Sequence, residues 1–280
     1  MFKQIFLITL IIFSSSYPVA IFHGFLDSCE NPYFSSLSKL IKYQTGYYST
    51  CIESGGGADD LTTSFQYQAE KACEQIKNNS NFQSDFSILS VSQGGLLARY
   101  IIEKCEMKGT VKKFVSFGGP MMGTSKVPFC LGGVVCYLIN SIVDFIVYSK
   151  SVQNSIGPSG YFRTPAHLDS YLKSNSFLVN LNNEGENFDQ KAKDRFLLLE
   201  RMVLIGFKED RMISPKETAE FSIYDENYNV VPMNETNVYK NDTFGLQTLH
   251  KQDKLLIIYL PGEHISFTTD DIINYAIPNL

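Results

Sequence analysis

The sequence predicts an α/β fold, in which a mostly parallel sheet is flanked by helices and carries a small cap insertion. Short apolar runs alternate with longer amphipathic ones along the chain, and no repeat or linker divides it. Strands interleaved with helices of about ten or more residues imply right-handed crossovers and therefore parallel strands. The 280 residues are enough to bury one sizeable hydrophobic core. We therefore expect residues 17–280 to form a single domain.

Apolar runs bounded by polar residues and glycines are the expected strands: Pro18–Phe22, Tyr47–Ile52, Phe86–Val91, Val111–Phe117, Met202–Gly206 and Leu255–Leu260. Longer amphipathic segments are the expected helices: Tyr33–Tyr43, Leu61–Lys77 and Gly95–Lys104. In sheets of this kind chemistry collects at the carboxyl ends of the strands. The loops that follow the strands are therefore the expected place of a functional site.

The stretch Leu131–Tyr148 interrupts this alternation. Its 18 residues carry one charged side chain, Asp144, and barely reach the length of a membrane-spanning helix. A carboxylate inside a bilayer would be costly unless it served a function. We therefore interpret the stretch as a cap helix that is apolar on more than one side, within an insertion over roughly residues 130–185.

Residues 1–16 are expected to be a signal peptide. A short apolar run follows Lys3, and the small residues Ser14 and Ser16 suit cleavage after position 16. The run is too short to stay in a bilayer about 30 Å thick as an anchor, and a buried first helix is the alternative. We expect the mature chain to have no transmembrane anchor and to follow the secretory pathway, to the lysosome or out of the cell.

Two further features agree with an oxidising compartment. The six cysteines include no CxxC pair, which favours disulfides over zinc and leaves their pairing open. Asn-x-Ser/Thr sequons make glycosylation expected at Asn78, Asn234 and Asn241.

The composition excludes other classes. Hydrophobic residues make up 44 % and charged residues 19 % of the chain, which is too apolar for a disordered protein. The net charge is −5 and the Lys and Arg residues are scattered, so no nucleic acid partner is expected. The segment Gly118–Gly123 lacks the Lys of a phosphate-binding loop, and Gly55–Gly57 with Asp59 and Asp60 is interpreted as a flexible loop. We expect a monomer without cofactor or metal.

Ser92 is the predicted nucleophile. It follows the expected strand Phe86–Val91 and precedes a helical segment, which is the setting of a nucleophile elbow. Such a turn needs small residues two positions before and two after the serine. Ser90 and Gly94 meet this need for Ser92, whereas Ser90 as nucleophile would have Ile88 before it. An ordinary strand-to-helix turn is the alternative, and the elbow interpretation predicts the α/β-hydrolase fold.

A serine hydroxyl needs a base to take its proton. Of the four histidines, His264 follows the last expected strand, where an α/β-hydrolase places its base. The remaining three are interpreted as structural or surface residues: His23, His167 and His250.

The base in turn needs an acid that fixes its orientation. Asp210 follows the expected strand Met202–Gly206, so the chain order Ser92, Asp210, His264 is the one typical of this fold. Glu209 and Asp225 are the alternative acids.

Two backbone N–H groups are expected to form an oxyanion hole, because the tetrahedral intermediate of acyl transfer needs donors aimed at its oxygen. One belongs to Gln93, the residue after the nucleophile. The other belongs to Phe25, in the loop His23-Gly24-Phe25 after the first expected strand. We expect Gly24, in the same loop, to contact the substrate.

These motifs resemble those of the palmitoyl-protein thioesterase family over nearly the whole mature chain. The resemblance rests on ordered blocks: His23–Cys29, Ser92–Gly95, Ser116–Gly123, Ser176–Leu178 with Leu181–Glu184, Phe244–Leu246 and Gly262–His264. It implies hydrolysis of long-chain acyl thioesters on lipidated proteins, in lysosomes. Ser92, Asp210 and His264 fall on the family's triad positions, and Phe25 and Gln93 fall on its oxyanion positions.

The resemblance also implies two disulfides, Cys73–Cys105 and Cys130–Cys136, which leaves Cys29 and Cys51 to form a third. Two features depart from the family pattern. Glu30 stands where one branch has a second cysteine next to Cys29, and the family's Tyr-Trp-His-Asp-Pro cap motif appears as Gly160–Pro165 in a chain without Trp. The sequence thus mixes features of two branches with different acyl preferences.

The expected reaction is a two-step acyl transfer through an acyl-enzyme on Ser92, with a lipid-modified protein or acyl-CoA as partner. Burial contributes ~0.8 kcal/mol per CH₂, so an apolar groove could supply most of the binding. Its expected lining is Val134–Tyr148 and the Gly118–Met122 loop, including Met121 and Met122. The alternatives are a lipase or carboxylesterase with the same triad, and a non-catalytic lipid carrier.

Overall fold

The computed structural model describes residues 17–127, 143 and 146–280. A parallel sheet with strand order β2-β1-β3-β4-β5-β8 runs through the molecule. Its strands are β1 Val19–Phe22, β2 Ser49–Ile52, β3 Phe86–Val91, β4 Val111–Phe117, β5 Arg201–Phe207 and β8 Leu255–Leu260. Three of these have the predicted limits and the others differ by one or two residues. The predicted α/β fold is confirmed.

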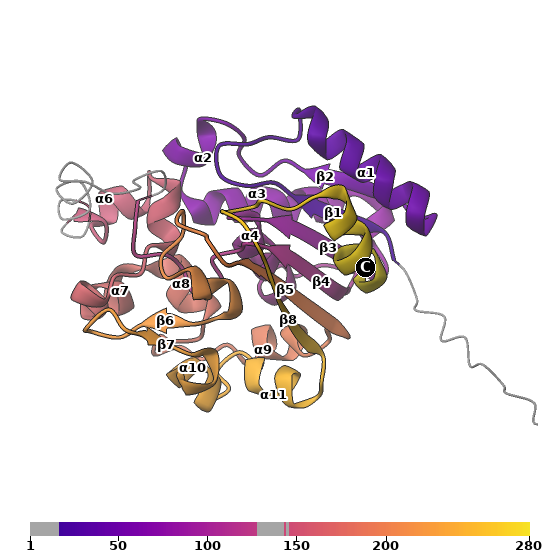
Figure 1. Ribbon diagram of the computed structural model, residues 1–280. Helices are drawn as coiled ribbons and strands as arrows, with labels where there is room; N and C mark the ends of the chain where they lie inside the picture. Colours follow the sequence, from indigo (N-terminus) through magenta and orange to yellow (C-terminus); the bar gives the residue numbers. More distant parts are fainter. Residues whose placement is uncertain (1–16, 128–142, 144–145) are drawn as a thin grey trace, which may run out of the picture.

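Helices cover both faces of this sheet (Figure 1). On one face lie α1 (Pro32–Thr45) and the C-terminal turns α12 (Thr269–Asp271), η6 (Ile272–Ala276) and η7 (Ile277–Asn279), where Ile21 and Phe117 belong to the core. On the other lie α3 (Phe65–Asn78), α4 (Gly94–Glu103), α9 (Gln190–Phe196) and α11 (Leu246–Lys251), packed on a larger core with Phe22 and Phe114. Side chains alternate between the two cores because successive residues of a strand point to opposite faces.

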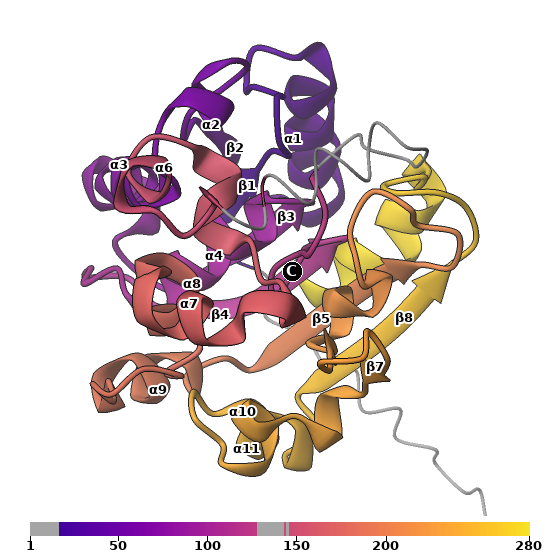
Figure 2. The same cartoon turned by 90° about the vertical axis from the view of Figure 1, so that its left-hand side faces the viewer.

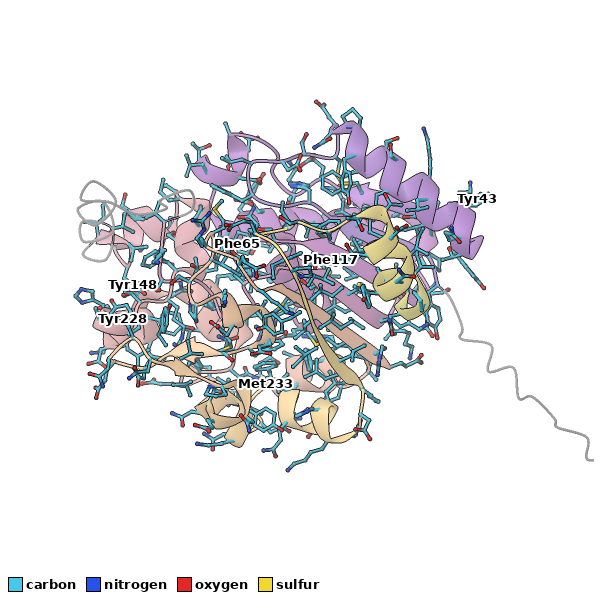
Figure 3. All side chains as sticks on the ribbon, in the orientation of Figure 1. Tyr43, Phe65, Phe117, Tyr148, Tyr228 and Met233 are labelled. Atoms are coloured by element: carbon cyan, nitrogen blue, oxygen red, sulfur yellow. A yellow bond between two sulfur atoms is a disulfide. The ribbon has the colours of Figure 1, made fainter. Side chains whose placement is uncertain are left out.

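Figure 3 draws the side chains on the same ribbon and labels residues of the core and of the surface. Phe65 and Phe117 are fully buried, in the larger and the smaller core respectively. Tyr43, at the outer end of α1, is 86 % exposed. Helix α1 is capped at its start by Asn31, whose side chain accepts a hydrogen bond from the N–H of Tyr33. It is capped at its end by Gly46, which adopts the left-handed conformation that favours glycine.

The predicted single helix Leu61–Lys77 is wrong, because the structure has two helices there. The short α2 spans Asp59–Thr62 and α3 spans Phe65–Asn78. Thr63 between them is extended, with φ −122° and ψ 136°, and the hydroxyl of Ser64 caps α3 by accepting a hydrogen bond from the N–H of Tyr67. The apolar pattern continues through both helices, but the helical structure is interrupted between them, where Ser64 caps the second helix.

Most of the remaining elements lie in the two long connections that follow β4 and β5 (Figures 1 and 2). Between β4 and β5 the described residues form α6 Lys150–Gln153, η2 Gly157–Tyr161, η3 Pro165–His167, α7 Leu168–Ser174, α8 Ser176–Leu181 and α9. Between β5 and β8 lie η4 Lys216–Glu220, the hairpin β6 Ile223–Tyr224 with β7 Val230–Val231, η5 Met233–Glu235, α10 Asn237–Lys240 and α11. A further short turn, η1, spans Ser80–Phe82.

Some expectations fall outside the described residues. These are the signal peptide at 1–16, the cysteines Cys130 and Cys136, and most of the apolar stretch Leu131–Tyr148. Within the part of the chain that is described, every helix is too short or too polar to cross a bilayer.

Candidate active site

Ser92 lies at a sharp turn between β3 and α4. Its φ is +51°, a left-handed value that is uncommon for a residue other than glycine and that typically marks a functional constraint. The N–H of Ser92 donates to the carbonyl of Phe117, 2.8 Å away in the neighbouring strand, which fixes the turn to the sheet. A β-carbon on Gly94 would lie 2.5 Å from the carbonyl oxygen of His23, so only glycine permits α4 to begin this close to β1. The geometry is that of a nucleophile elbow.

The structure brings Ser92, His264 and Asp210 into one hydrogen-bonded line from the ends of three strands. Nε2 of His264 lies 2.9 Å from Oγ of Ser92, and Nδ1 of the same ring lies 2.6 Å from Oδ2 of Asp210. The side chains of His264 and Asp210 are only 10 % and 2 % exposed. The ring can therefore receive a proton from the serine while the carboxylate holds its other nitrogen.

Asp210 is held in place by its own chain. Its Oδ1 accepts hydrogen bonds from the N–H groups of Met212 at 2.8 Å and Ile213 at 3.3 Å, which leaves Oδ2 for the histidine. Glu209, an alternative acid, instead accepts a hydrogen bond from the N–H of Gly262. Asp225, the other alternative, closes an exposed turn at residues 227–229.

The expected oxyanion loop lies against the serine. A β-carbon on Gly24 would be 3.3 Å from Cβ and 3.9 Å from Oγ of Ser92, so this loop approaches Ser92 as closely as a residue without a side chain allows. Phe25 and Gln93 both line the pocket that contains Ser92. The backbone groups predicted for the oxyanion hole therefore belong to the two segments that flank the serine.

The pocket around Ser92 is a cavity of about 210 Å³ with a mostly apolar lining. Besides Ser92, His264 and the oxyanion loop, its walls include Pro120, Tyr161, Ile213 and Ile265. Ile265, directly after the histidine, has φ +55°, which is an outlier for a β-branched residue. The loop after β4 makes room for His264, because a β-carbon on Gly118 would lie 3.2 Å from the ring carbon Cε1.

Met121 and Met122, expected to contact the substrate, do not line this pocket. The side chain of Met121 is fully buried in the larger core, and its carbonyl accepts a hydrogen bond from Arg99. Met122 borders a second cavity of about 500 Å³ between the cap elements and the β6–β7 hairpin. The loop after β4 packs inward because Gly119 and Gly95 leave space for the Met121 side chain.

Tyr161 also lines this pocket, and no role is predicted for it from the sequence. It stands in the segment Gly160–Pro165 that resembles the family's cap motif, and that position is the signal from which its importance could be inferred. Its hydroxyl donates a 3.0 Å hydrogen bond to Oε1 of Gln93. Burial raises the pKa of Tyr161 above the usual range of a phenol, so the hydroxyl keeps its proton and acts as donor.

Of the other histidines, His23 and His250 have other partners than Ser92. His167 and His250 are exposed, and His250 pairs with the hydroxyl of Tyr239 at 2.8 Å. His23 is buried and its Nε2 lies 3.0 Å from Oε1 of Glu53. His23, Cys29 and Glu53 are the only candidate metal ligands that cluster within the described chain, but the sulfur of Cys29 is bonded to Cys51 and is no thiolate ligand.

Two disulfides are present in the described residues. Cys73 in α3 is bonded to Cys105 after α4, and Cys29 is bonded to Cys51 in β2. The three sequon asparagines Asn78, Asn234 and Asn241 are all exposed. Glycosylation at these positions stays a prediction.

The strained serine between a strand and a helix, and the hydrogen-bonded Asp and His after β5 and β8, define a serine hydrolase of the α/β-hydrolase class. A family model described as palmitoyl protein thioesterase matches residues 18–264. The chain belongs to this family, as the motifs predicted.

Relatives agree with this assignment. The chain is 29 % identical to palmitoyl-protein thioesterase 1 of Caenorhabditis elegans, over 92 % of this chain and 89 % of that protein. It is 30 % identical to lysosomal thioesterase PPT2-B of Xenopus laevis, over 88 % and 85 %. A solved monoacylglycerol lipase from Paleococcus ferrophilus matches with a TM-score of 0.47 and 13 % identity, covering 89 % of this chain and 88 % of that one. A likeness of that degree carries no information on the substrate.

Proposed function

We propose that this chain hydrolyses long-chain fatty-acyl thioesters, on S-acylated proteins or peptides and on acyl-CoA. Ser92 is the nucleophile, His264 the general base and Asp210 the acid that orients it. The observation that carries the proposal is the line of contacts from Ser92 Oγ to His264 at 2.9 Å and on to Asp210 at 2.6 Å, in a chain of this family.

In the first step Oγ of Ser92 attacks the thioester carbonyl while Nε2 of His264 takes the hydroxyl proton. The carbonyl oxygen becomes an oxyanion, and the N–H groups of Phe25 and Gln93 donate hydrogen bonds to it. When the intermediate collapses, the carbon–sulfur bond breaks and the thiol leaves with the proton held by His264. The product is an acyl ester on Ser92.

In the second step a water molecule takes the place of the thiol. His264 accepts a proton from the water, and the resulting hydroxide attacks the acyl carbonyl in the same oxyanion hole. The bond to Ser92 Oγ then breaks, the proton returns to the serine and the fatty acid is released. Asp210 stabilises the imidazolium in both steps without taking the proton.

The same proposal includes a place in the secretory pathway, either lysosomal or secreted, after removal of residues 1–16. Two disulfides favour an oxidising compartment. The word lysosomal in the name of the Xenopus laevis relative supports the first destination.

Paired kinetics of palmitoyl-CoA and a palmitoyl ester of matched leaving-group size test the substrate class. We expect kcat/KM to favour the thioester, and the Ser92→Ala variant to lose turnover of both and labelling by a fluorophosphonate probe. A preference for the oxygen ester would instead indicate a lipase or carboxylesterase. Wild-type protein that is folded but takes no label would indicate a non-catalytic carrier.

A further inference from the structure

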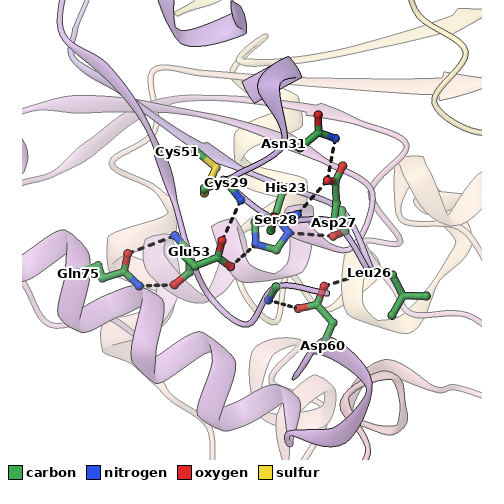
Figure 4. Close-up of polar contacts among 12 residues, drawn as sticks. His23, Leu26, Asp27, Ser28, Cys29, Asn31, Cys51, Glu53, Asp60 and Gln75 are labelled. Atoms are coloured by element: carbon green, nitrogen blue, oxygen red, sulfur yellow. Dashed lines mark hydrogen bonds and ion pairs between the residues drawn. A yellow bond between two sulfur atoms is a disulfide. The ribbon is translucent and has the colours of Figure 1, made fainter. Parts of the chain in front are cut away.

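The loop His23–Cys29, which carries the Phe25 N–H, is held from outside by two carboxylates. Figure 4 shows Glu53, after β2, and Asp60, in α2, both hydrogen-bonded to this loop. We propose that Glu53 and Asp60 are positioning residues that fix the Phe25 N–H in the geometry needed to stabilise the oxyanion. This inference rests on the proposed function, and it assigns a role in the reaction to a segment that the sequence predicts only to be a flexible loop.

Asp60 holds the peptide that follows Phe25. Its side chain is fully buried, and Oδ2 accepts a 2.9 Å hydrogen bond from the N–H of Leu26. Oδ1 accepts a second hydrogen bond, 3.1 Å from the N–H of Gly56. Leu26 has φ +60°, a strained left-handed conformation for leucine. The hydrogen bond to Asp60 opposes that strain, so without it Leu26 can relax and turn the preceding peptide.

Glu53 holds the peptide that contains the Phe25 N–H itself, through His23. Nδ1 of His23 lies 2.9 Å from the carbonyl oxygen of Gly24, and that carbonyl belongs to the same peptide group as the Phe25 N–H. In a planar trans peptide the two bonds point in opposite directions. The histidine therefore fixes the direction of the N–H by holding the oxygen.

The His23 ring is in turn fixed by Glu53. Its Nε2 lies 3.0 Å from Oε1 of Glu53, so both ring nitrogens face acceptor oxygens and the doubly protonated imidazolium satisfies both. The second carboxylate oxygen of Glu53 accepts a 2.8 Å hydrogen bond from the N–H of Cys29, at the end of the loop. The side-chain amide of Gln75 and the backbone of Glu53 form two reciprocal hydrogen bonds, which anchor this residue on α3.

Covalent and backbone links fix the rest of the loop to the same support. Cys29 is bonded to Cys51, two residues before Glu53, and the N–H of Gly57 donates to the carbonyl of Asp27 at 2.9 Å. The loop is thus clamped along its length to the segment from β2 to α2. Both peptide groups that flank Phe25 depend on a carboxylate from that segment.

Isosteric variants test this assignment. Asp60→Asn and Glu53→Gln remove a negative charge with almost no change in shape, and Asp59→Asn and Glu30→Gln are matched controls because both residues are exposed. Loss of one oxyanion donor typically costs on the order of 100- to 1,000-fold in kcat, so loosening one should cost roughly 10- to 100-fold. We expect that loss in kcat with KM for palmitoyl-CoA within about two-fold, and no change in the controls.

A palmitoyl trifluoromethyl ketone separates positioning from a merely structural role. It forms an oxyanion-bearing adduct with the serine, so its affinity should fall by the same factor as kcat/KM, while the affinity for a non-hydrolysable palmitoyl thioether stays unchanged. Folded variants with wild-type kcat and ketone affinity would overturn the proposal. Equal losses of ketone and thioether affinity would overturn it too, because they would indicate general damage to the pocket.

The rate of fluorophosphonate labelling keeps this test independent of the substrate. If wild-type protein is labelled at Ser92 but does not turn over palmitoyl-CoA, the proposed function is wrong, and the labelling rates of the variants still test positioning. If Asp60→Asn does not fold, slower labelling of the folded Glu53→Gln variant is sufficient to support the assignment. Wild-type labelling rates in every folded carboxylate variant would contradict it.

Discussion

The hydroxyl of Tyr161 lies 3.0 Å from Oε1 of Gln93 and donates a hydrogen bond to it, joining the cap segment η2 to the residue after the nucleophile. Both side chains are buried, and Tyr161 packs edge-on against Phe65 with ring centroids 5.0 Å apart. The segment η2 therefore supplies one wall of the pocket and a hydrogen bond to Gln93. It holds the side chain of a residue whose backbone is proposed to stabilise the oxyanion.

Tyr161→Phe should lower kcat/KM by about three- to ten-fold, because it removes a hydrogen bond worth about 1 kcal/mol and leaves Oε1 of Gln93 without a donor. Steady-state kinetics with palmitoyl-CoA measure this effect. Tyr43→Phe is the matched control, since Tyr43 lies on the surface far along α1. Equal kinetics of Tyr161→Phe and wild type would show that the contact does not influence the oxyanion hole.

Ser90 occupies the position two before the nucleophile, where glycine is usual. It is fully buried in β3, and its hydroxyl has no hydrogen-bond partner among the described residues. Because a buried hydroxyl without a partner is destabilising, Ser90→Ala should raise the free energy of unfolding by up to about 1 kcal/mol and leave activity unchanged. Ser90→Val should lower stability by about 1–3 kcal/mol, because the added methyl groups overpack the elbow. Urea unfolding measures both, and a destabilised Ser90→Ala variant would contradict the prediction.

Arg99 and Glu103 form a fully buried ion pair on α4, with Nε and Oε1 2.8 Å apart. The guanidinium also donates to the carbonyl of Met121 at 2.8 Å and to the side chain of Asn182 at 2.9 Å. Its positive charge lies over the ring of Phe244, 4.5 Å from the centroid. One side chain thus joins the helix after the nucleophile to the loop after β4 and to the cap.

Arg99→Met should lower the free energy of unfolding by about 3–5 kcal/mol, because it leaves the Glu103 carboxylate buried without its partner. Denaturant unfolding measures the loss. Arg211→Met is the control, since Arg211 pairs with Glu263 on the surface, where water and salt weaken an ion pair. Replacing both buried partners with apolar residues should destabilise less than Arg99→Met alone. A fully stable single variant would contradict the prediction.

The sheet was predictable because each strand is an apolar run with clear ends. Phe86–Val91 and Val111–Phe117 are buried over nearly their whole length and were predicted with the observed limits. The three residues proposed as the triad follow such strands, so their positions in the chain predicted that they would lie close together. The break between α2 and α3 was missed because the apolar pattern continues through it, and only the capping side chain of Ser64 marks it.

Contacts made across the fold were not predictable in the same way. Asp60 meets Leu26, and Tyr161 meets Gln93, over separations of 34 and 68 residues. The local sequence pattern does not predict such pairs. In a loop rich in glycine it does not distinguish a buried aspartate from an exposed one. Met121 was expected in the substrate groove because it is apolar and near the site, but the geometry of the loop after β4 turns it into the core.

His23 and Glu53 make the stability of the oxyanion loop depend on pH. Burial alone lowers the pKa of His23, but its hydrogen bonds to Glu53 and Gly24 and the charges of Glu53 and Asp60 outweigh burial and raise it above 6.5. A group whose pKa is higher in the folded than in the unfolded protein stabilises the fold at pH values below its pKa in the unfolded protein. This contribution is lost as the pH rises through its pKa in the folded protein. The histidine therefore favours the folded state in acid.

Burial alone raises the pKa of Glu53, but hydrogen bonds from His23 and Cys29 and the charges of His23 and Lys71 leave it below 4.5. Its contribution is present above pH 4.5 and is lost as the pH falls through the lowered value. The pair is thus strongest between about pH 4.5 and 6.5.

The difference in Tm between wild type and Glu53→Gln should be largest in that window and should shrink by pH 8, whereas Glu30→Gln should show no such dependence. Thermal unfolding across pH 4–8 measures it, and a difference that stays constant between pH 6 and 8 would mean that His23 is neutral in the folded protein.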